Sequence, residues 1–390
     1  MSLVVFPFKN ENPEVLLKNI KIALSHPRVG EVLCVGAEED VCFHSVAQAI
    51  PTLISEFGKP VKVMLQERIG KLRPGKGDGM NTGLRYFVEK TSRERIHFYD
   101  ADLLSFTPQW ITKAEEAADL GYQVVRHYFP RASTDGMITW FITRPGFAIL
   151  WPRSELPRIQ QPLGGELLLT REVAEKFVED PRIQNQSDWG IDTLYTFGTV
   201  AWGYSIYETY MAVGKLHKLY GTLADLRTML VECFAAIQSL AGEQVPSQCL
   251  HHVEYPGSVP EEVKTRVGFD FDGTLALLAQ GWTKRQAELF ELFPSQVRKG
   301  LLSTQRYPQV TFMDEDAWYE TYLVLLKHFQ REDPDWQELL FKLWICRVLT
   351  YTVKVALRGY DVAMQYLHET VERYIRKSAL NRESTRSKEC

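Results

Sequence analysis

The first 130 residues alternate between segments typical of β-strands and segments typical of α-helices, and this alternation limits the possible folds most strongly. Apolar runs at 3–8, 31–37 and 61–65 each predict a strand, and helical patterns separate them. Residues 95–102 and 122–129 predict two more strands in the same order. Strands that alternate with helices favour βαβ units and an α/β fold with a mainly parallel sheet. In such a sheet, ligands bind beyond the carboxyl ends of the strands.

The pattern becomes less regular from residue 137 onward. Residues 137–152 form an apolar run that predicts a pair of strands, and residues 164–177 predict a strand that runs into a helix. Residues 187–198 then predict a helix, and residues 200–210 predict a late strand. Beyond Gly221 helical patterns prevail, so the chain changes character there.

We therefore expect two domains, a catalytic α/β domain over residues 1–220 and a mostly helical C-terminal domain over residues 221–390. The helical part is rich in Trp and Tyr. Packing against the first domain is the commonest explanation of such aromatic residues, a homo-oligomer interface is the second, and stacking on a nucleotide or sugar is the third. A non-catalytic interaction scaffold is one alternative function for the chain.

Composition and charge narrow the function classes. The formal net charge is −4, which argues against nucleic acid as the main partner. No apolar run approaches the length of a membrane-spanning helix, and the N-terminus lacks the pattern of a signal peptide, so no membrane partner is expected. The six cysteines form no CxxC pair, which argues against a zinc site and fits a reducing, cytoplasmic environment.

An acidic pair, Asp100 and Asp102, ends the strand predicted at 95–102. Residues two apart on an extended strand project to the same face. Mg²⁺ and Mn²⁺ prefer oxygen ligands and commonly share one or two protein carboxylates with substrate phosphates. The pair therefore predicts a divalent-metal site, with a short acidic surface turn as the alternative.

A basic, glycine-rich loop precedes the acidic pair in the chain. It carries Lys71, Arg73 and Lys76 among four glycines at 70, 75, 77 and 79. Glycine permits close backbone approach, and the cations supply charge for a phosphate. The loop is neither a GxxxxGK[ST] motif nor a GxGxxG motif. A solvated loop is the alternative, but together with the acidic pair it favours a phosphate and metal site.

Five segments occur in an order that resembles nucleotide-sugar-dependent glycosyltransferases of the GT-A fold, a Rossmann-like α/β fold with a mixed, mainly parallel sheet. They are FPFKNE, GKGDGMNTGLR, YDADL, GGELLLT and DWGIDT. Their details resemble the mannosylglycerate synthase family, whose members transfer mannose from GDP-mannose to D-glycerate with retention, giving the compatible solute α-mannosylglycerate. The resemblance implies the same fold, reaction and substrates, and a divalent metal (Mn or Mg) as cofactor.

The resemblance also implies which residues bind the donor and the metal. Asp102 would ligate the metal between the two phosphates, and His217 would supply a further metal contact. Asp100 would bind the ribose side, and Asp192 would hold the mannose hydroxyls near the reacting carbon, so the three aspartates are the candidate catalytic residues. The donor-binding residues implied in this way are Pro7, Lys9, Glu11, Gln66, Lys76, Asp100, Ala101, Leu163, Asp192, Lys218 and Tyr220.

The resemblance places the acceptor at residues 129–139. D-glycerate carries one carboxylate and two hydroxyl groups, so its site needs a cation and neutral donors. A guanidinium group suits a carboxylate, which makes Arg131 the natural anchor, although a solvated loop arginine is the alternative. The other acceptor residues are Asp135, Gly136, Met137 and Thr139.

Retention of configuration leaves two mechanisms open. A carboxylate nucleophile would form a covalent sugar–enzyme intermediate, and Asp192 is the evident candidate. In front-face attack, the departing phosphate instead takes the proton of the acceptor on the same face. We favour front-face attack.

A second acidic motif, FDFDGT at 269–274, matches the nucleophile motif of haloacid-dehalogenase-like phosphatases. In that alternative function, Asp270 would be the nucleophile and Asp272 the general acid. The segments that follow read as helices, without the repeated βα units that a phosphatase of this class requires. The other interpretation is that Asp270 or Asp272 caps a helix that begins near Thr274.

Overall fold

The computed structural model describes residues 1–216, 222–303 and 311–389, and it divides into two compact units. Unit 1 comprises residues 1–130, the described part of 159–219, and 245–258. Unit 2 comprises residues 131–158 and the described parts of 220–244 and 259–390. The two units therefore differ from a single division of the chain at residue 220, since residues 131–158 group with the later helices.

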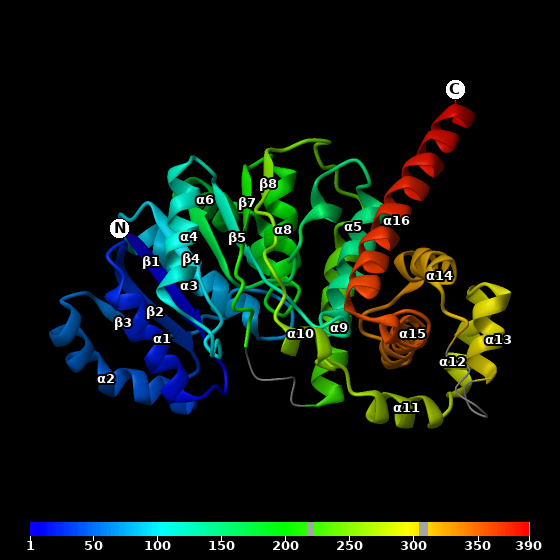
Figure 1. Cartoon of the computed structure of the whole chain (residues 1–390), viewed down its shortest axis with the longest axis horizontal. Coiled ribbons are helices and arrows are strands. Elements are labelled where there is room, and N and C mark those ends of the chain that lie inside the picture. Colours follow the sequence, from blue (N-terminus) through cyan, green and yellow to red (C-terminus); the bar gives the residue numbers. More distant parts are fainter. Residues whose placement is uncertain (217–221, 304–310, 390) are drawn as a thin grey trace. The chain divides into compact units, whose positions relative to one another are not determined.

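Unit 1 is built around an eight-stranded sheet with the order β3-β2-β1-β4-β6-β5-β7-β8 (Figure 1). Every strand is parallel to the others except β6, which is antiparallel to both β4 and β5. The strands are β1 (Ser2–Pro7), β2 (Val29–Gly36), β3 (Val61–Leu65), β4 (Arg95–Phe98), β5 (Val124–Tyr128), β6 (Leu167–Thr170), β7 (Ile206–Tyr210) and β8 (His251–Val253). The predicted α/β fold with a mixed, mainly parallel sheet is confirmed.

Helices cover both faces of this sheet, which explains why strands such as β1 and β2 are buried along nearly their whole length. On one face α1 (Pro13–Ser25) packs against α2 (Val41–Phe57) and α4 (Pro108–Asp119). On the other face α3 (Lys76–Lys90), α6 (Arg171–Glu179) and α8 (Ile191–Ala201) pack together, with α7 (Pro181–Asn185) beside α6 and α8. Because both layers lie beside the strands, the carboxyl ends of the parallel strands stay open for a ligand.

Unit 2 is helical in its described part. Its long helices are α9 (Leu223–Ser239), α14 (Glu315–His328), α15 (Pro334–Lys354) and α16 (Tyr360–Glu389). The shorter α-helices are α5 (Arg144–Leu150), α10 (Glu261–Thr265), α11 (Phe271–Ala279), α12 (Lys284–Leu289) and α13 (Ser295–Ser303). The π-helix η1 (Thr139–Thr143) and the 3₁₀ turns η2 (Leu156–Arg158), η3 (Phe290–Leu292) and η4 (Ala356–Arg358) complete it.

The strand pair predicted for residues 137–152 is wrong. This segment forms η1 and α5, with Pro145 in the first turn of α5. Its backbone carbonyls are held within unit 2, since the indole of Trp318 donates to the carbonyl of Phe141 at 2.8 Å and the hydroxyl of Tyr322 donates to that of Ile142 at 2.8 Å. A segment that is buried on all sides is mostly apolar around its whole circumference, so its pattern does not separate a buried strand from a buried helix.

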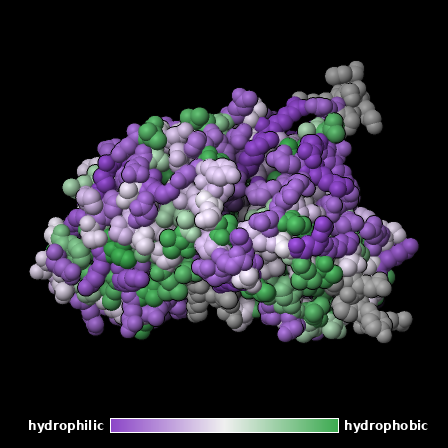
Figure 2. Space-filling view, viewed as in Figure 1, coloured by the Kyte–Doolittle hydropathy of each residue, from purple (hydrophilic) through white to green (hydrophobic). Residues whose placement is uncertain are grey.

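The surface seen in Figure 2 is mixed, with hydrophobic residues scattered among hydrophilic ones. In the part of the chain that the structure describes, no helix is both long enough and apolar enough to cross a membrane.

Candidate active site at the carboxyl ends of the strands

The candidate donor site lies where β1, β3 and β4 end, next to the first turn of α3. A methyl group added to Gly79 in α3 would lie 3.2 Å from Oε1 of Gln66 and 3.4 Å from Cβ of Pro7. Gln66 directly follows β3, and Pro7 is the last residue of β1. Asp100 follows β4 after one residue. The structure therefore brings these predicted donor residues to one edge of the sheet.

A continuous set of ion pairs crosses this edge. Nζ of Lys76 lies 2.9 Å from Oδ2 of Asp192 and 3.3 Å from Oδ1 of Asp100. Nζ of Lys215 pairs with Oδ2 of Asp100 and lies 2.5 Å from Oε1 of Glu166. Two lysines thus join three carboxyl groups in a partly buried cluster that we call the carboxylate–lysine cluster.

Glycines allow Lys76 to reach this cluster. A methyl group on Gly77 would lie 2.1 Å from the carbonyl oxygen of Gln186, so the first turn of α3 fits against that segment only without a side chain. A methyl group on Gly165 would lie 2.6 Å from both Oδ1 of Asp100 and Nζ of Lys76. Gly77 of the GKGDGMNTGLR segment and Gly165 of the GGELLLT segment therefore allow close packing. Of the three predicted loop cations, Lys76 enters the site, whereas Lys71 and Arg73 are exposed.

Burial and charge shift the pKa values of the carboxyl groups in opposite directions. Burial alone would raise the pKa of Asp100, but the ammonium groups of Lys215 and Lys76 hold it well below its usual range. Burial raises the pKa of Glu166 to about 7, since Lys215 offsets the loss of water only in part and Asp100 repels a second negative charge. Burial also raises the pKa of Asp192, against the attraction of Lys76. Asp100 is therefore ionised at neutral pH, while Glu166 gains or loses its proton near neutral pH.

The two lysines stay protonated. Burial would lower the pKa of each ammonium group, but the surrounding carboxylates outweigh this effect and place both pKa values above the usual range for lysine. The site therefore offers fixed positive charge beside the acidic pair, which is what a diphosphate requires.

Asp192 keeps one carboxylate oxygen available. It stands in the first turn of α8, and its side chain is 4% exposed. Oδ1 of Asp192 is buried and makes no hydrogen bond within residues 1–216, 222–303 and 311–389, while Oδ2 binds Lys76. A buried acceptor without a donor costs free energy, so a hydroxyl group of a ligand would be a favourable partner.

A buried cradle holds the loop at 160–165, which carries Leu163. Nη2 of Arg126 donates to the carbonyl oxygens of Gln161 at 3.3 Å and Gly164 at 3.1 Å. The carboxylate of Glu208 accepts from the amide of Gln160 at 2.9 Å and 3.0 Å. Arg126 and Glu208 are almost fully buried. Arg126 and Glu208 thus hold the backbone of this loop in place next to Asp100 and Lys76.

The remaining predicted donor and metal residues that the structure describes lie around the same edge. Ala101 is buried directly after Asp100, and Asp102 is half-buried in the turn that follows β4. Lys9 is exposed in the loop after β1, where the carbonyl of Glu11 accepts from the thiol of Cys42 at 3.2 Å. Three predicted residues lie outside the described part of the chain: His217, Lys218 and Tyr220.

The predicted acceptor residues lie together within unit 2. Nε of Arg131 is 3.9 Å from Oδ2 of Asp135, and Oδ1 of Asp135 accepts from the amide of Gly136 at 2.6 Å. Gly136 has φ = +66°, and a methyl group there would lie 2.7 Å from Nη1 of Arg131, so the turn requires glycine. Met137 and Thr139 are buried at the start of η1.

The FDFDGT segment has no catalytic geometry of its own. Residues 266–270 form no strand, and the side chain of Asp270 accepts from the amide of Gly273 at 2.9 Å as the N-cap of α11. The phosphatase motif therefore lacks the strand that would present its nucleophile, and the helix-cap interpretation is confirmed.

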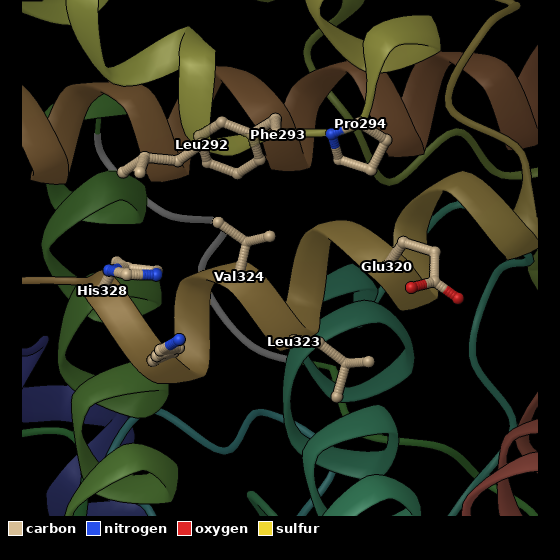
Figure 3. A pocket seen from close by; sticks show the side chains of 8 residues that line it. Leu292, Phe293, Pro294, Glu320, Leu323, Val324 and His328 are labelled. Atoms are coloured by element: carbon tan, nitrogen blue, oxygen red, sulfur yellow. The ribbon is translucent and has the colours of Figure 1, made fainter. Parts of the chain in front are cut away.

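A surface pocket of about 460 Å³ beside α14, lined by residues such as Phe293, Leu323 and Val324, contains none of the predicted site residues (Figure 3).

Sequence reasoning missed four site residues, namely Lys215, Glu166, Arg126 and Glu208. Glu166 stands in the GGELLLT segment and Lys215 two residues before His217, so proximity to predicted residues was the available signal. Arg126 and Glu208 sit inside apolar strands, where a charged residue signals a buried role.

Comparisons with known proteins give the family of this chain. Family models match residues 2–239 (mannosylglycerate synthase, GT domain) and residues 263–371 (mannosylglycerate synthase C-terminal domain). The mannosylglycerate synthase of Rhodothermus marinus is 63% identical over 97% of this chain and 96% of its own length. That of Selaginella moellendorffii is 51% identical over 97% of this chain and 91% of its own.

Solved structures resemble the chain more distantly. Glucosyl-3-phosphoglycerate synthase from Mycobacterium tuberculosis, in complex with Mn²⁺, uridine diphosphate and phosphoglyceric acid, is 21% identical, with a TM-score of 0.47 over 63% of this chain and 79% of that chain. Mannosyl-3-phosphoglycerate synthase from Rubrobacter xylanophilus is 19% identical, with a TM-score of 0.46 over 62% and 74%. With two family models and two close relatives in agreement, the chain belongs to the mannosylglycerate synthase family of glycosyltransferases.

Proposed function

We propose that the chain transfers mannose from GDP-mannose to D-glycerate with retention of configuration, giving α-mannosylglycerate, in a reaction that depends on a divalent metal. Family membership supports the product, and one observation supports the donor: Lys76 pairs with both Asp100 and Asp192. A single ammonium group thus links the carboxylate assigned to the nucleotide with the carboxylate assigned to the sugar. A nucleotide sugar spans those two functions within one molecule.

The donor site divides into three parts in this proposal. The guanosine would lie at the end of β1, near Pro7, Lys9 and Glu11. The ribose and diphosphate would lie over Gln66, Lys76 and Asp100, with Lys218 and Tyr220 as further predicted contacts. The mannose would meet the backbone at Leu163 and Oδ1 of Asp192. This oxygen is buried and has no donor among the residues that the structure describes, which supports a hydroxyl partner.

The residues present fit a divalent metal that is shared with the diphosphate. Among the described residues no group of three or more His, Cys, Asp or Glu forms a closed metal site. Mg²⁺ and Mn²⁺ often use only one or two protein groups and take further oxygens from phosphates and water. Asp102 would hold the ion, with His217 as the second predicted ligand. When bound, such an ion neutralises charge that develops on the departing diphosphate.

We propose front-face attack for the transfer step. The bond between the anomeric carbon and the phosphate oxygen breaks as an acceptor hydroxyl forms the new bond on the same face, and its proton passes to the departing phosphate oxygen. Lys76 would stabilise the leaving GDP by charge. Asp192 would orient the sugar through Oδ1 while Lys76 holds Oδ2, a role that needs no covalent adduct.

The acceptor would bind through its carboxylate to Arg131, with Asp135 and Thr139 facing its hydroxyl groups. The guanidinium group is bidentate and always charged, which suits a small carboxylate. The guanidinium of Arg131 lies so close to Gly136 that a methyl group added there would be 2.7 Å from Nη1, which supports a defined position for this guanidinium.

The test is a donor panel assayed for release of nucleoside diphosphate, with and without D-glycerate and with and without Mn²⁺ or Mg²⁺. We expect metal-dependent GDP release from GDP-mannose that D-glycerate stimulates. Equal rates with UDP-glucose, or full activity in the presence of a chelator, would contradict the proposal. Mass spectrometry of the enzyme during turnover adds a second test, because a mannosyl adduct on Asp192 would overturn front-face attack.

A further inference from the structure

The FDFDGT segment matches a phosphatase motif but forms no strand, so its part in this fold differs from that of a phosphatase motif. Gly268, the residue directly before this segment, packs on the predicted acceptor loop at Asp135, and both residues belong to unit 2. The amide of Gly268 donates to Oγ1 of Thr134 at 2.9 Å. A methyl group on Gly268 would lie 2.7 Å from Cβ and 3.0 Å from Cα of Asp135. No flexible side-chain end could move aside, because the nearest atoms are the Cβ and the backbone of Asp135.

Two buried side chains of α15 hold the same loop from another side. The indole of Trp344 donates to the carbonyl oxygen of Met137 at 3.2 Å. The hydroxyl of Tyr351 donates to the carbonyl oxygen of Ser133 at 2.8 Å. The ring of Phe269 packs on Trp344 with centroids 5.6 Å apart, which links these contacts to the segment at 268–270. Asp270 then fixes the direction of that segment by capping α11.

We propose that Gly268, Phe269, Trp344 and Tyr351 form an acceptor clamp, which positions Asp135 and Arg131 and thereby sets the affinity for the small hydroxy-carboxylate acceptor. This inference rests on the proposed function. The clamp residues are positioning residues, since Gly268, Trp344 and Tyr351 contact the loop and Phe269 packs on Trp344. The amide of Gly268 and the side chains of Trp344 and Tyr351 bind this loop at Thr134, Met137 and Ser133, on both sides of Asp135. The position of Asp135 therefore depends on these contacts.

Two variants test the clamp, each with a matched control in unit 2. Gly268→Ala pushes against Asp135, whereas Gly300→Ala meets the ring of Phe312 on a different segment. Tyr351→Phe removes the hydrogen bond to Ser133, whereas Tyr374→Phe removes a part-buried hydrogen bond of the same kind, from a tyrosine hydroxyl to the carbonyl of Glu315. Initial rates are measured at varied D-glycerate with saturating GDP-mannose, and GDP affinity and acceptor-free GDP release are measured separately.

We expect Gly268→Ala to raise KM for D-glycerate by about tenfold or more. Displacing a positioned group by about 1 Å is enough for a loss of this size. Tyr351→Phe should raise it about three- to fivefold, the effect of one lost hydrogen bond. GDP affinity, KM for GDP-mannose and acceptor-free GDP release should stay at wild-type values in both variants. The two controls should lose thermal stability without a change in KM for D-glycerate.

An unchanged KM for D-glycerate in folded Gly268→Ala and Tyr351→Phe would overturn the clamp, as would an equal rise in KM for GDP-mannose. If Gly268→Ala fails to fold, Tyr351→Phe against Tyr374→Phe decides. Failure of the proposed function is distinguishable, because the wild-type enzyme itself would then show no stimulation of GDP release by D-glycerate.

Discussion

Nζ of Lys76 lies 2.9 Å from Oδ2 of Asp192, and this contact joins α3 to α8 across the candidate donor site. The same ammonium group lies 3.3 Å from Oδ1 of Asp100. One side chain therefore balances two carboxylates that come from distant parts of the sequence. The proposed chemistry depends on this balance, because GDP departs with negative charge that a fixed cation stabilises.

Replacing Lys76 by Met should lower kcat/KM for GDP-mannose by about 100-fold or more, the size typical for loss of one preorganised charge in an active site. Asp100 and Asp192 would lose their shared cation, and repulsion would keep the diphosphate away. The matched control is Lys113→Met, which removes a part-buried lysine that lies 2.6 Å from Glu254 and 3.0 Å from the carbonyl of Tyr210. Wild-type kcat/KM in a folded Lys76→Met enzyme would contradict the assignment.

Replacing Arg126 by Lys keeps the charge but removes the planar group that reaches three carbonyls of the 160–165 loop. We expect kcat/KM for GDP-mannose to fall about tenfold or more, because the loop beside Asp100 would lose its fixed position. Affinity for GDP, which lacks the sugar, should change little. Isothermal titration and initial rates measure the two effects.

Arg171→Lys is the control for Arg126→Lys. Arg171 also donates to backbone carbonyls, at 2.8 Å to that of Arg93 and at 2.9 Å to that of Thr91. It directly follows β6, however, whereas Glu166 directly precedes this strand. It should lower the free energy of unfolding without changing kcat/KM. Equal kinetic losses in both variants would show that Arg126 has no particular role in the site.

Glu166 should make stability fall as pH rises. Burial raises its pKa to about 7, above the usual 4.5, so the folded state holds a proton that the unfolded chain has released between these two values. The associated stability is fully present below about pH 4.5 and is lost as pH rises through about 7. From the size of the shift, the loss is up to about 3 kcal/mol relative to Glu166→Gln.

Urea unfolding at several pH values between about 4.5 and 8 measures this difference. The free energy of unfolding of the wild type, minus that of Glu166→Gln, should decrease across this window. A difference that is constant or increases with pH would show that Glu166 is ionised throughout and that Lys215 compensates its burial fully.

The order of strands and helices could be predicted because alternating apolar patterns report it directly. The strands β1 to β5 lie where the sequence predicts them, within a few residues. The reversed direction of β6 could not be predicted, since pairing partners leave no local pattern. The strand prediction for residues 137–152 is wrong, because burial of this segment on all sides removes the periodicity that separates a helix from a strand.

The site could be predicted in part. Asp100, Lys76 and Asp192 stand in short motifs whose order is informative, and the structure brings them together. Glu166 and Lys215 join them only through tertiary packing, so their sequence neighbourhoods alone did not assign them. The cytoplasmic location and a homo-oligomer formed through the helical region stay predictions.

The central claim is retaining transfer of mannose from GDP-mannose to D-glycerate, and NMR of the product tests it most directly. The enzyme is incubated with GDP-mannose labelled with ¹³C at the anomeric carbon, D-glycerate and Mn²⁺, and the one-bond carbon–proton coupling of the new glycoside is recorded. We expect a single glycerate-linked product with the coupling of an α-mannoside, and none without D-glycerate. A β-mannoside, or free mannose alone at every D-glycerate concentration, would contradict it.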